Sequence, residues 1–326
     1  MPASVESEDQ TYVLSHRSKQ TEEHERLNRQ HNLIQQTFLN NQLIHPSIPL
    51  SSLKGGIADI GCGTGIWLQE VAQCLLSLDS DNGTLASASP TTTTLPSLVG
   101  FDLNAAAFPE NPTPGIHLVQ HDCTKPFDAR YHGQFDLVNI RGLAYAITEE
   151  KLSRALDNAL LLLRPGGYLQ WTESEARLFK VFPETPDMLK AMEIIDLERR
   201  ARDLVPYLPH FMLRRTLSLK GDNDEDALGI LHFNLRPGGF CQDDADPDVC
   251  LQFSDLLTES VSLFLHSALM RMEQQQFENG TAAENGNLRK LELDELRKLK
   301  ASVSETIEAK QVRMGGIFPH LVAQKR

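Results

Sequence analysis

The sequence lacks features that define several large classes of protein. It carries 31 Lys and Arg residues against 44 Asp and Glu residues, a formal net charge of -13, so it has no basic surplus for neutralising nucleic-acid phosphates. No apolar run approaches the roughly twenty residues that a membrane-spanning helix requires. We therefore expect neither nucleic acid nor a membrane among its partners.

Cysteine is also scarce. The five cysteines are odd in number and lack the close pairing of a zinc or redox motif, which favours a reducing compartment. The first twenty residues are polar and charged, so we expect no secretory signal and a cytoplasmic location. The acidic run Asp244–Asp248 has Val249 where a calcium loop needs glycine. We interpret it as a solvated turn and expect no metal.

The most informative stretch present is Ile57–Trp67. Its short apolar start has the length of a buried parallel strand and leads directly into Gly61, Gly63 and Gly65. Apolar residues at helical spacing follow from Trp67 onward. A strand-to-helix turn rich in glycine lets the backbone approach a ligand and points the free N–H groups of the helix at it.

Two kinds of ligand compete for such a turn. A dinucleotide fingerprint requires its third glycine at the position of Ile66, which weakens an NAD-dependent oxidoreductase as an interpretation. The run Asp59–Gly65 instead resembles the first motif of class I S-adenosylmethionine-dependent methyltransferases. The rest of the chain can support or weaken that resemblance.

Further strands end in polar residues at regular intervals. The expected second strand ends at Asp102, and the third is followed by Asp122, while Phe135–Arg141 and Leu163–Glu173 contain the fourth and fifth. Ligands of open α/β sheets bind outside the carboxyl ends of the strands. A run rich in Ser and Thr, residues 79–97, accounts for the long interval between the glycines and Asp102, and we interpret it as a flexible insertion.

The order of these motifs is similar to that of class I methyltransferases over residues 55–175. The resemblance implies a Rossmann-like α/β fold, with a mostly parallel seven-stranded sheet and helices on both faces. It implies S-adenosyl-L-methionine as the cofactor, with Asp102 at the ribose, Asp122 at the adenine amino group, and Asn139 and Arg141 near the methionine. The full set of expected cofactor-binding residues is Tyr12, Asp59, Gly61, Cys62, Gly63, Gly65, Asp102, Leu103, Asp122, Cys123, Asn139 and Arg141.

A narrower resemblance extends to both ends of the chain. The segments around Tyr12 and Arg26, together with Gln170–Glu173 and Met314–Pro319, resemble fungal secondary-metabolism methyltransferases, in which an N-terminal helix helps to close the cofactor site. We therefore expect three parts: an N-terminal helical segment (1–50), a cofactor-binding core (51–181), and a C-terminal part (182–326) with substrate-pocket helices and the final strands. The helical additions would form a cap.

The remaining helices are expected from apolar periodicity. The predicted ranges are 21–43, 143–163, 185–203, 254–275 and 287–310, with a short strand at 231–235 and a last, antiparallel strand at 312–324. The segment Pro206–Phe211 reads as a loop of the kind that lines pockets.

Methyl transfer from a sulfonium requires mainly that the acceptor be held in line and kept from water. A general base helps a hydroxyl but is dispensable for a neutral amine. Glu173, at the ligand end of the fifth strand, and His31 are the candidate catalytic residues, with His210 and His232 as weaker candidates and Tyr145 as a pocket residue.

The leading hypothesis is methylation of an N, O or S atom of a small natural product. No Asn-Pro-Pro-aromatic run follows the fourth strand, where Asn139–Gly142 stands, and this favours a small-molecule acceptor over nucleic acid. The alternative is a regulatory methyltransferase-like protein that acts through protein partners. The sequence leaves the acceptor and the oligomeric state open.

Overall fold

The first strand, β1 (Gly56–Ile60), is buried at every residue, as a short apolar strand must be when helices cover both faces of its sheet. It lies in an eight-stranded sheet in the computed structural model, which describes residues 20–38, 41–81, 95–220, 227–239, 246–278 and 286–326. The other strands are β2 (Ser97–Asp102), β3 (Ile116–Gln120), β4 (Phe135–Arg141), β5 (Leu163–Thr172), β6 (Glu175–Phe182), β7 (Leu228–Gly238) and β8 (Arg313–Lys325).

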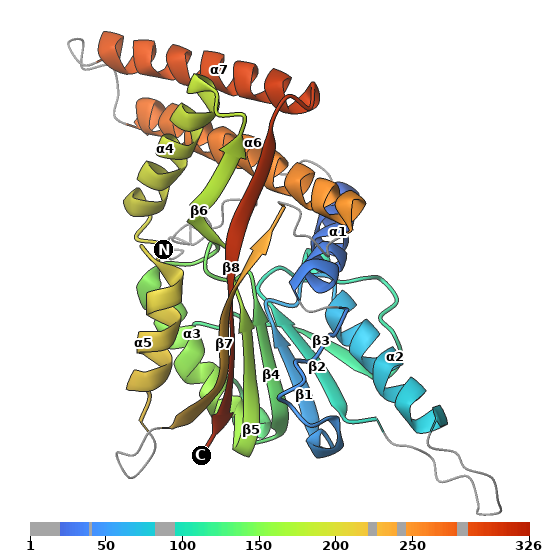
Figure 1. The fold of residues 1–326 in the computed structure, drawn as a ribbon. Coiled ribbons are helices and arrows are strands. Elements are labelled where there is room, and N and C mark those ends of the chain that lie inside the picture. Colours follow the sequence, from blue (N-terminus) through green and yellow to red (C-terminus); the bar gives the residue numbers. More distant parts are fainter. Residues whose placement is uncertain (1–19, 39–40, 82–94, 221–226, 240–245, 279–285) are drawn as a thin grey trace, which may run out of the picture.

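The strands run in the order β3-β2-β1-β4-β5-β8 (Figure 1). The first five are parallel, and β8 pairs antiparallel with β5. β6 continues the line of β5 along β8, since Thr172 pairs with His320 and Glu175 with Ile317. β7 pairs with β8 through Ile317 and Leu321 as well, so it occupies the opposite edge.

The predicted α/β class with a mostly parallel sheet is confirmed. The sheet has eight strands among the described residues instead of the expected seven because the chain re-enters the sheet as β6 directly after β5. The antiparallel last strand is confirmed as β8, and the short strand expected at 231–235 is the longer β7.

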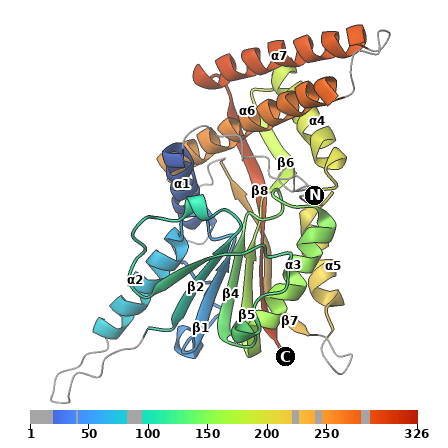
Figure 2. The same cartoon turned by 180° about the vertical axis from the view of Figure 1, so that it is seen from behind.

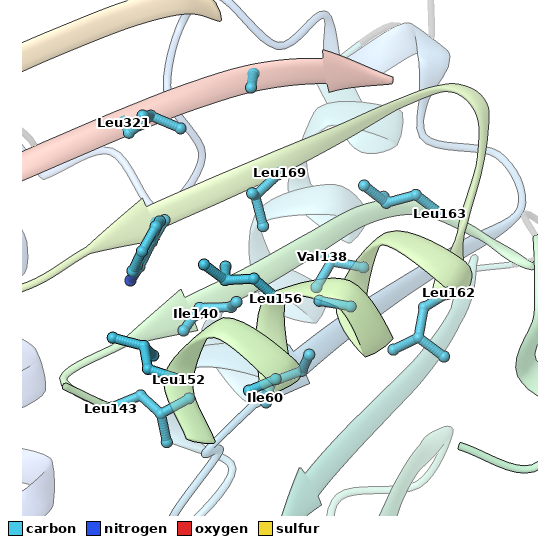
Figure 3. Packing of buried hydrophobic residues seen from close by; sticks show 14 of the residues in the cluster. Ile60, Val138, Ile140, Leu143, Leu152, Leu156, Leu162, Leu163, Leu169 and Leu321 are labelled. Carbon is cyan, nitrogen blue, oxygen red and sulfur yellow. The ribbon is translucent and has the colours of Figure 1, made fainter. Parts of the chain in front are cut away.

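Helices cover the two faces of the sheet (Figures 1 and 2). On one face, α2 packs Trp67 and Leu68 against Ile57 and Leu137. On the other, α3 packs Leu152 and Leu156 against Val138, Ile140 and Leu169 (Figure 3). Alternate strand residues therefore belong to different cores. The helices are α1 (Gln20–Phe38), α2 (Ile66–Asp81), α3 (Glu149–Leu162), α4 (Pro186–Ala201), α5 (Leu208–Ser218), α6 (Pro247–Glu278) and α7 (Gly286–Glu308), with short 3₁₀ turns η2 (Leu50–Ser52), η3 (Ala105–Ala107) and η4 (Ala129–Tyr131).

A third apolar cluster forms a cap beyond the carboxyl ends of the parallel strands (Figure 1). It joins Leu33 of α1, Met188 of α4, Leu265 of α6, Val303 of α7 and Met314 of β8. The cap therefore unites helices from both ends of the chain, as the resemblance implied.

Several predicted element bounds are wrong. Helix α6 begins at Pro247 instead of at residue 254, so Pro247 and Asp248 of the acidic run lie in its first turn and not in a solvated turn. Helix α1 ends at Phe38, and Asn41 has a positive φ of 61°, so Leu43 packs from a turn. Helix α3 begins at Glu149, after a cap by the Thr148 side chain, which leaves residues 143–148 as a loop. Pro209 lies in the first turn of α5, where its missing N–H costs nothing, so the expected 206–211 loop is helical from Leu208 onward.

Candidate functional site

The turn between β1 and α2 has the backbone conformation that its glycines allow. Gly61, Gly63 and Gly65 have φ values of +70°, +54° and +75°, a region that other residues rarely adopt. A β-carbon on Gly65 would lie 3.1 Å from Cδ2 of Leu118. The turn is fixed to the next strand because the Gly61 and Cys62 N–H groups donate to the Phe101 carbonyl at 2.8 and 3.1 Å.

Asp102 lies at the end of β2, beside this turn. Its Oδ2 accepts a hydrogen bond from the Gly63 N–H at 2.8 Å, and its Oδ1 accepts one from the Asn104 N–H at 2.9 Å. Burial raises the pKa of this carboxyl. Each oxygen has a further lone pair, so the carboxylate can hold the glycine turn and accept hydrogen bonds from a sugar diol at once.

A row of polar side chains crosses three adjacent strands. Asn139 on β4 donates to Oδ1 of Asp59 on β1 at 2.8 Å, and Gln170 on β5 donates to Asn139 at 3.0 Å. The three residues are register partners. Burial raises the pKa of Asp59 to about 6. Gln170 also accepts from the His45 N–H at 2.8 Å, so the row anchors the segment after α1.

Helix α1 lies directly on the glycine turn. Asn28 accepts a hydrogen bond from the Thr64 hydroxyl at 2.7 Å, and Cδ1 of Leu27 lies 3.2 Å from where a β-carbon of Gly63 would stand. His31 is 1% exposed; its Nδ1 lies 2.8 Å from Nη2 of Arg141 and its Nε2 lies 3.0 Å from the Glu70 carboxylate. α1 therefore covers the carboxyl ends of β1 and β4.

The contacts of His31 define its tautomer and its charge. Arginine can only donate, so Nδ1 must accept and the proton lies on Nε2, toward Glu70. Burial, followed by the charge of Arg141, lowers the pKa of His31 to about 4. The imidazole is neutral at pH 7, and its basic nitrogen is already engaged.

Glu173 lies just beyond the end of β5 and is 2% exposed. Oε1 accepts from the Leu143 N–H at 3.0 Å and from Nε1 of Trp171 at 2.9 Å, while Oε2 accepts from the Ala144 N–H at 3.2 Å. Burial raises its pKa to about 7 despite these donors. The carboxylate holds the loop that follows β4.

The third strand contributes a smaller acidic turn. Oδ1 of Asp122 accepts from both the N–H and the hydroxyl of Thr124, at 2.9 and 2.7 Å. Although partial burial raises the pKa of Asp122, these hydrogen bonds outweigh it and lower the pKa. Burial raises the pKa of the neighbouring Cys123 to about 12. Leu103 is 61% exposed beside the same edge of the sheet.

The structure brings most of the predicted residues together around the carboxyl ends of β1, β2 and β4. Tyr12 lies outside the described residues. His210 is exposed on α5. His232 contacts the rings of His45 and His320 at the edge of the sheet formed by β7 and β8.

Sequence reasoning missed four residues that shape the site: Leu27, Asn28, Glu70 and Leu143. Glu70 carries a detectable signal, an ionisable side chain in the first turns of a mostly apolar helix. The others depend on how α1 and the loop after β4 pack, and the sequence pattern carries no sign of that.

A doubly covered α/β sheet with a glycine turn and an acid at the end of the next strand defines a nucleotide-type binding protein. Comparison with known proteins gives the family. The sequence model described as "Methyltransferase domain" matches residues 31–224, and the chain belongs to this family.

Curated relatives come from fungi. The chain is 34% identical to the methyltransferase grgD of a Penicillium species, over 47% of this chain and 49% of that protein. It is 30% identical to the N-methyltransferase sirN of Leptosphaeria maculans, over 47% of each. The matches thus span about half the length of these relatives. A solved SAM-dependent methyltransferase from Methanosarcina mazei aligns over 86% of this chain and 98% of its own, with 13% identity and a TM-score of 0.43.

Proposed function

We propose that the chain is an S-adenosylmethionine-dependent methyltransferase that methylates an N, O or S atom of a small natural product. The observation that carries the proposal is the glycine turn held by Asp102 at the carboxyl end of β2. The similarity to fungal methyltransferases, one of them an N-methyltransferase, supports it. Within the described residues no helix has the length and hydropathy needed to cross a membrane; we propose a cytoplasmic enzyme.

The residues present fit this cofactor. We assign the ribose hydroxyls to Asp102, whose oxygens keep free lone pairs, and the adenine edge to Asp122, Cys123 and Leu103. The methionine end belongs beside Asp59, Asn139 and Arg141, with Gly61, Cys62, Gly63 and Gly65 against the backbone of the ligand. Tyr12 remains a predicted contact. When bound, S-adenosylmethionine supplies an activated methyl group.

The protein's own contribution is positioning and exclusion of water. α1 covers the glycine turn, and Glu173 fixes the loop after β4, whose Leu143 contacts this turn. Because Arg141 occupies the basic nitrogen of His31 and three N–H donors hold the buried Glu173 carboxylate, we assign both a positioning role in place of the proton-accepting role expected from sequence. An amine acceptor that binds neutral needs no base.

The test is calorimetric titration of the full chain with S-adenosylhomocysteine, with NADH in parallel. We expect micromolar affinity for the first, about -8 kcal/mol, and no binding of NADH. Asp102→Ala should weaken binding at least tenfold because the ribose loses its acceptor and the Gly63 N–H loses its partner.

Asp128→Ala is the matched control. This acid caps η4 with a similar side-chain hydrogen bond, to the Arg130 N–H at 3.0 Å, but lies away from the glycine turn. Equal affinities of the two variants, or preference for NADH, would contradict the proposed function.

A further inference from the structure

A cavity of about 270 Å³ lies within the cap, away from the glycine turn. All of its lining residues come from β6 and α4, which lie side by side in Figure 1. Phe179, Met192 and Ile195 form its apolar wall. Binding sites for small molecules combine such a wall with a few directed polar groups. The polar groups here are Arg177, Glu193, Asp196 and Arg199.

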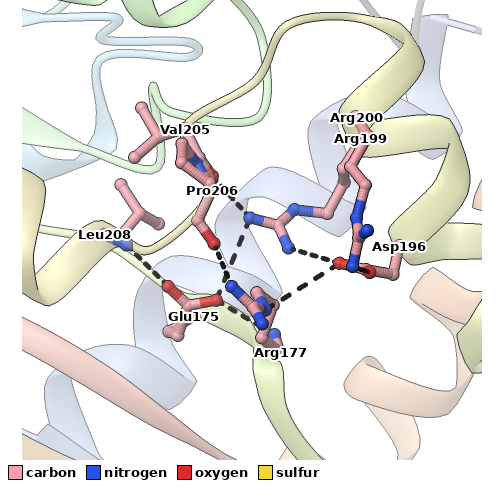
Figure 4. A network of polar contacts seen from close by, with 8 residues as sticks. All are labelled: Glu175, Arg177, Asp196, Arg199, Arg200, Val205, Pro206 and Leu208. Atoms are coloured by element: carbon pink, nitrogen blue, oxygen red, sulfur yellow. Dashed lines mark hydrogen bonds and ion pairs between the residues drawn. The ribbon is translucent and has the colours of Figure 1, made fainter.

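Charged side chains form the polar wall, and most of them pair with one another (Figure 4). Asp196 pairs with Arg177 and Arg199, and Glu193 pairs with Lys190 at 3.3 Å. The lining holds two guanidinium groups and two carboxylates, so its formal charge is balanced. The preference for an anionic ligand therefore depends on hydrogen-bond donors that the acids of the lining leave without an acceptor.

Arg199 has a donor to spare. Its side chain is 4% exposed, Nη2 donates to the Val205 carbonyl at 2.6 Å and Nη1 to Asp196 at 3.4 Å. Its buried Nε–H has no hydrogen-bond partner among the described residues. A buried donor without an acceptor is costly, and a carboxylate oxygen is the acceptor that guanidinium binds most strongly.

Glu175 does not accept a hydrogen bond from the Nε–H of Arg199. It is fully buried, and its oxygens accept from the Leu208 N–H at 2.7 Å and the Arg177 N–H at 3.0 Å. Arg177 is 45% exposed, so the cavity has an open side through which a ligand can enter.

A short segment joins the cavity to the glycine turn. At one end of this segment, Cδ1 of Leu143 lies 3.6 Å from where a β-carbon of Gly61 would stand. At the other end, the centre of the Tyr145 ring lies 5.6 Å from Cζ of Arg199. The Tyr145 ring also packs at 5.7 Å against Phe264 of α6. One wall therefore runs from the cofactor end of the sheet to the arginines.

We propose that this cavity binds the carboxylate end of the methyl acceptor, a small acid with an aromatic or aliphatic group beside its carboxylate. The inference rests on the proposed function and adds the class of substrate. Arg177 and Arg199 bind the carboxylate, and Phe179, Met192 and Ile195 contact the apolar group.

The test uses two probes of equal apolar size, 3-phenylpropionate and 3-phenylpropan-1-ol, titrated by ligand-observed NMR into the full chain saturated with S-adenosylhomocysteine. We expect the Kd of the acid to be at least tenfold lower than that of the alcohol. Equal affinities, or no binding of either probe, would overturn the inference.

Two variants locate the binding. Arg177→Gln should raise the Kd of the acid about tenfold and leave that of the alcohol unchanged. Arg200→Gln is the matched control, because Arg200 also pairs with Asp196 but does not line the cavity. The Kd of the acid for this variant should stay within twofold of its Kd for the unsubstituted chain. Equal weakening by both variants would show a general charge effect and contradict the assignment.

Arg199→Lys keeps the charge and removes the Nε–H donor. This variant should also raise the Kd of the acid about tenfold. If this buried variant fails to unfold cooperatively, the comparison of Arg177→Gln with Arg200→Gln decides alone. Calorimetry with S-adenosylhomocysteine separates the two proposals. Binding of the acid without the cofactor product contradicts the methyltransferase assignment, whereas binding of the cofactor product without the acid contradicts only this inference.

Discussion

Glu173 illustrates how neighbours determine the part that a single buried acid can play. Its oxygens accept from the N–H groups of Leu143, Ala144 and Trp171, and all of these partners are donors. A carboxylate can accept hydrogen bonds from all three N–H groups. A glutamine amide has only one accepting oxygen, and its NH₂ group would face the Ala144 N–H, which would lose its acceptor.

We therefore expect Glu173→Gln to lower the free energy of unfolding by about 1–3 kcal/mol, the cost of a buried group left unpaired. Hydrogen exchange at the Leu143 and Ala144 amides should accelerate. Glu149→Gln is the control, since Glu149 pairs with Arg214 at the surface and should change neither quantity. Unchanged exchange at residues 143 and 144 would remove the positioning role.

At the scale of elements, α1 is the helix whose placement matters most for the site. It contributes little to the sheet core and is held on the glycine turn by Asn28 and His31. Leu27 adds an apolar contact to the turn, and Leu33 packs on the other side into the apolar cluster of the cap.

His31→Ala should release α1 from Arg141 and Glu70. We expect faster hydrogen exchange along residues 24–36 and an affinity for S-adenosylhomocysteine about five- to tenfold lower, the equivalent of roughly 1–1.4 kcal/mol. His24→Ala serves as control, because His24 is on the same helix but its Nε2 bonds to the Ala106 carbonyl at 3.1 Å in place of Arg141 or Glu70. If both variants bind alike, α1 is not a cover for the site.

At the scale of the whole molecule, three histidines join distant parts of the chain. His45 lies 4.1 Å from His232 of β7 and 5.4 Å from His320 of β8, measured between ring centroids. Burial, together with the neighbouring histidines and Arg236, lowers the pKa of His320 to about 3 and that of His45 to about 4. The cluster ties the segment after α1 to the far edge of the sheet.

A lowered pKa in the folded state makes stability depend on pH in a definite direction. Below pH 6.5 the unfolded chain binds protons at His320 that the folded chain does not, so the contribution of His320 to stability falls as pH falls. His320→Asn removes this loss. We expect the variant to be less stable at pH 7, with a deficit that narrows by roughly 1 kcal/mol per pH unit between pH 6.5 and 4.5.

Urea unfolding at several pH values measures that difference. The comparison with the original chain cancels the opposite contributions of Asp59 and Glu173, whose raised pKa values favour the folded state at low pH. His117→Asn, at an exposed position of β3, should show a deficit that does not vary with pH. A constant deficit for His320→Asn would contradict the buried, neutral imidazole.

The sequence by itself determined the sheet and its ligand end. Apolar runs of strand length, a glycine turn and polar residues at strand ends are local patterns, and each was readable because the burial of parallel strands and the φ requirements of the turn act within a few residues. The presence of five parallel strands, with Asp102 at the end of the second and Asp122 just after the third, followed from these patterns.

The tertiary structure decided what those residues contact. β6 pairs with β8, a strand more than a hundred residues later in the sequence. Leu43 joins the core from a turn beyond the end of α1. His31 is neutral because it is buried and because the charge of Arg141, distant in sequence, lies beside it. Burial and hydrogen-bond partners come from packing across long sequence separations. The arginine-lined cavity arises in the same way, where β6 and α4 come together.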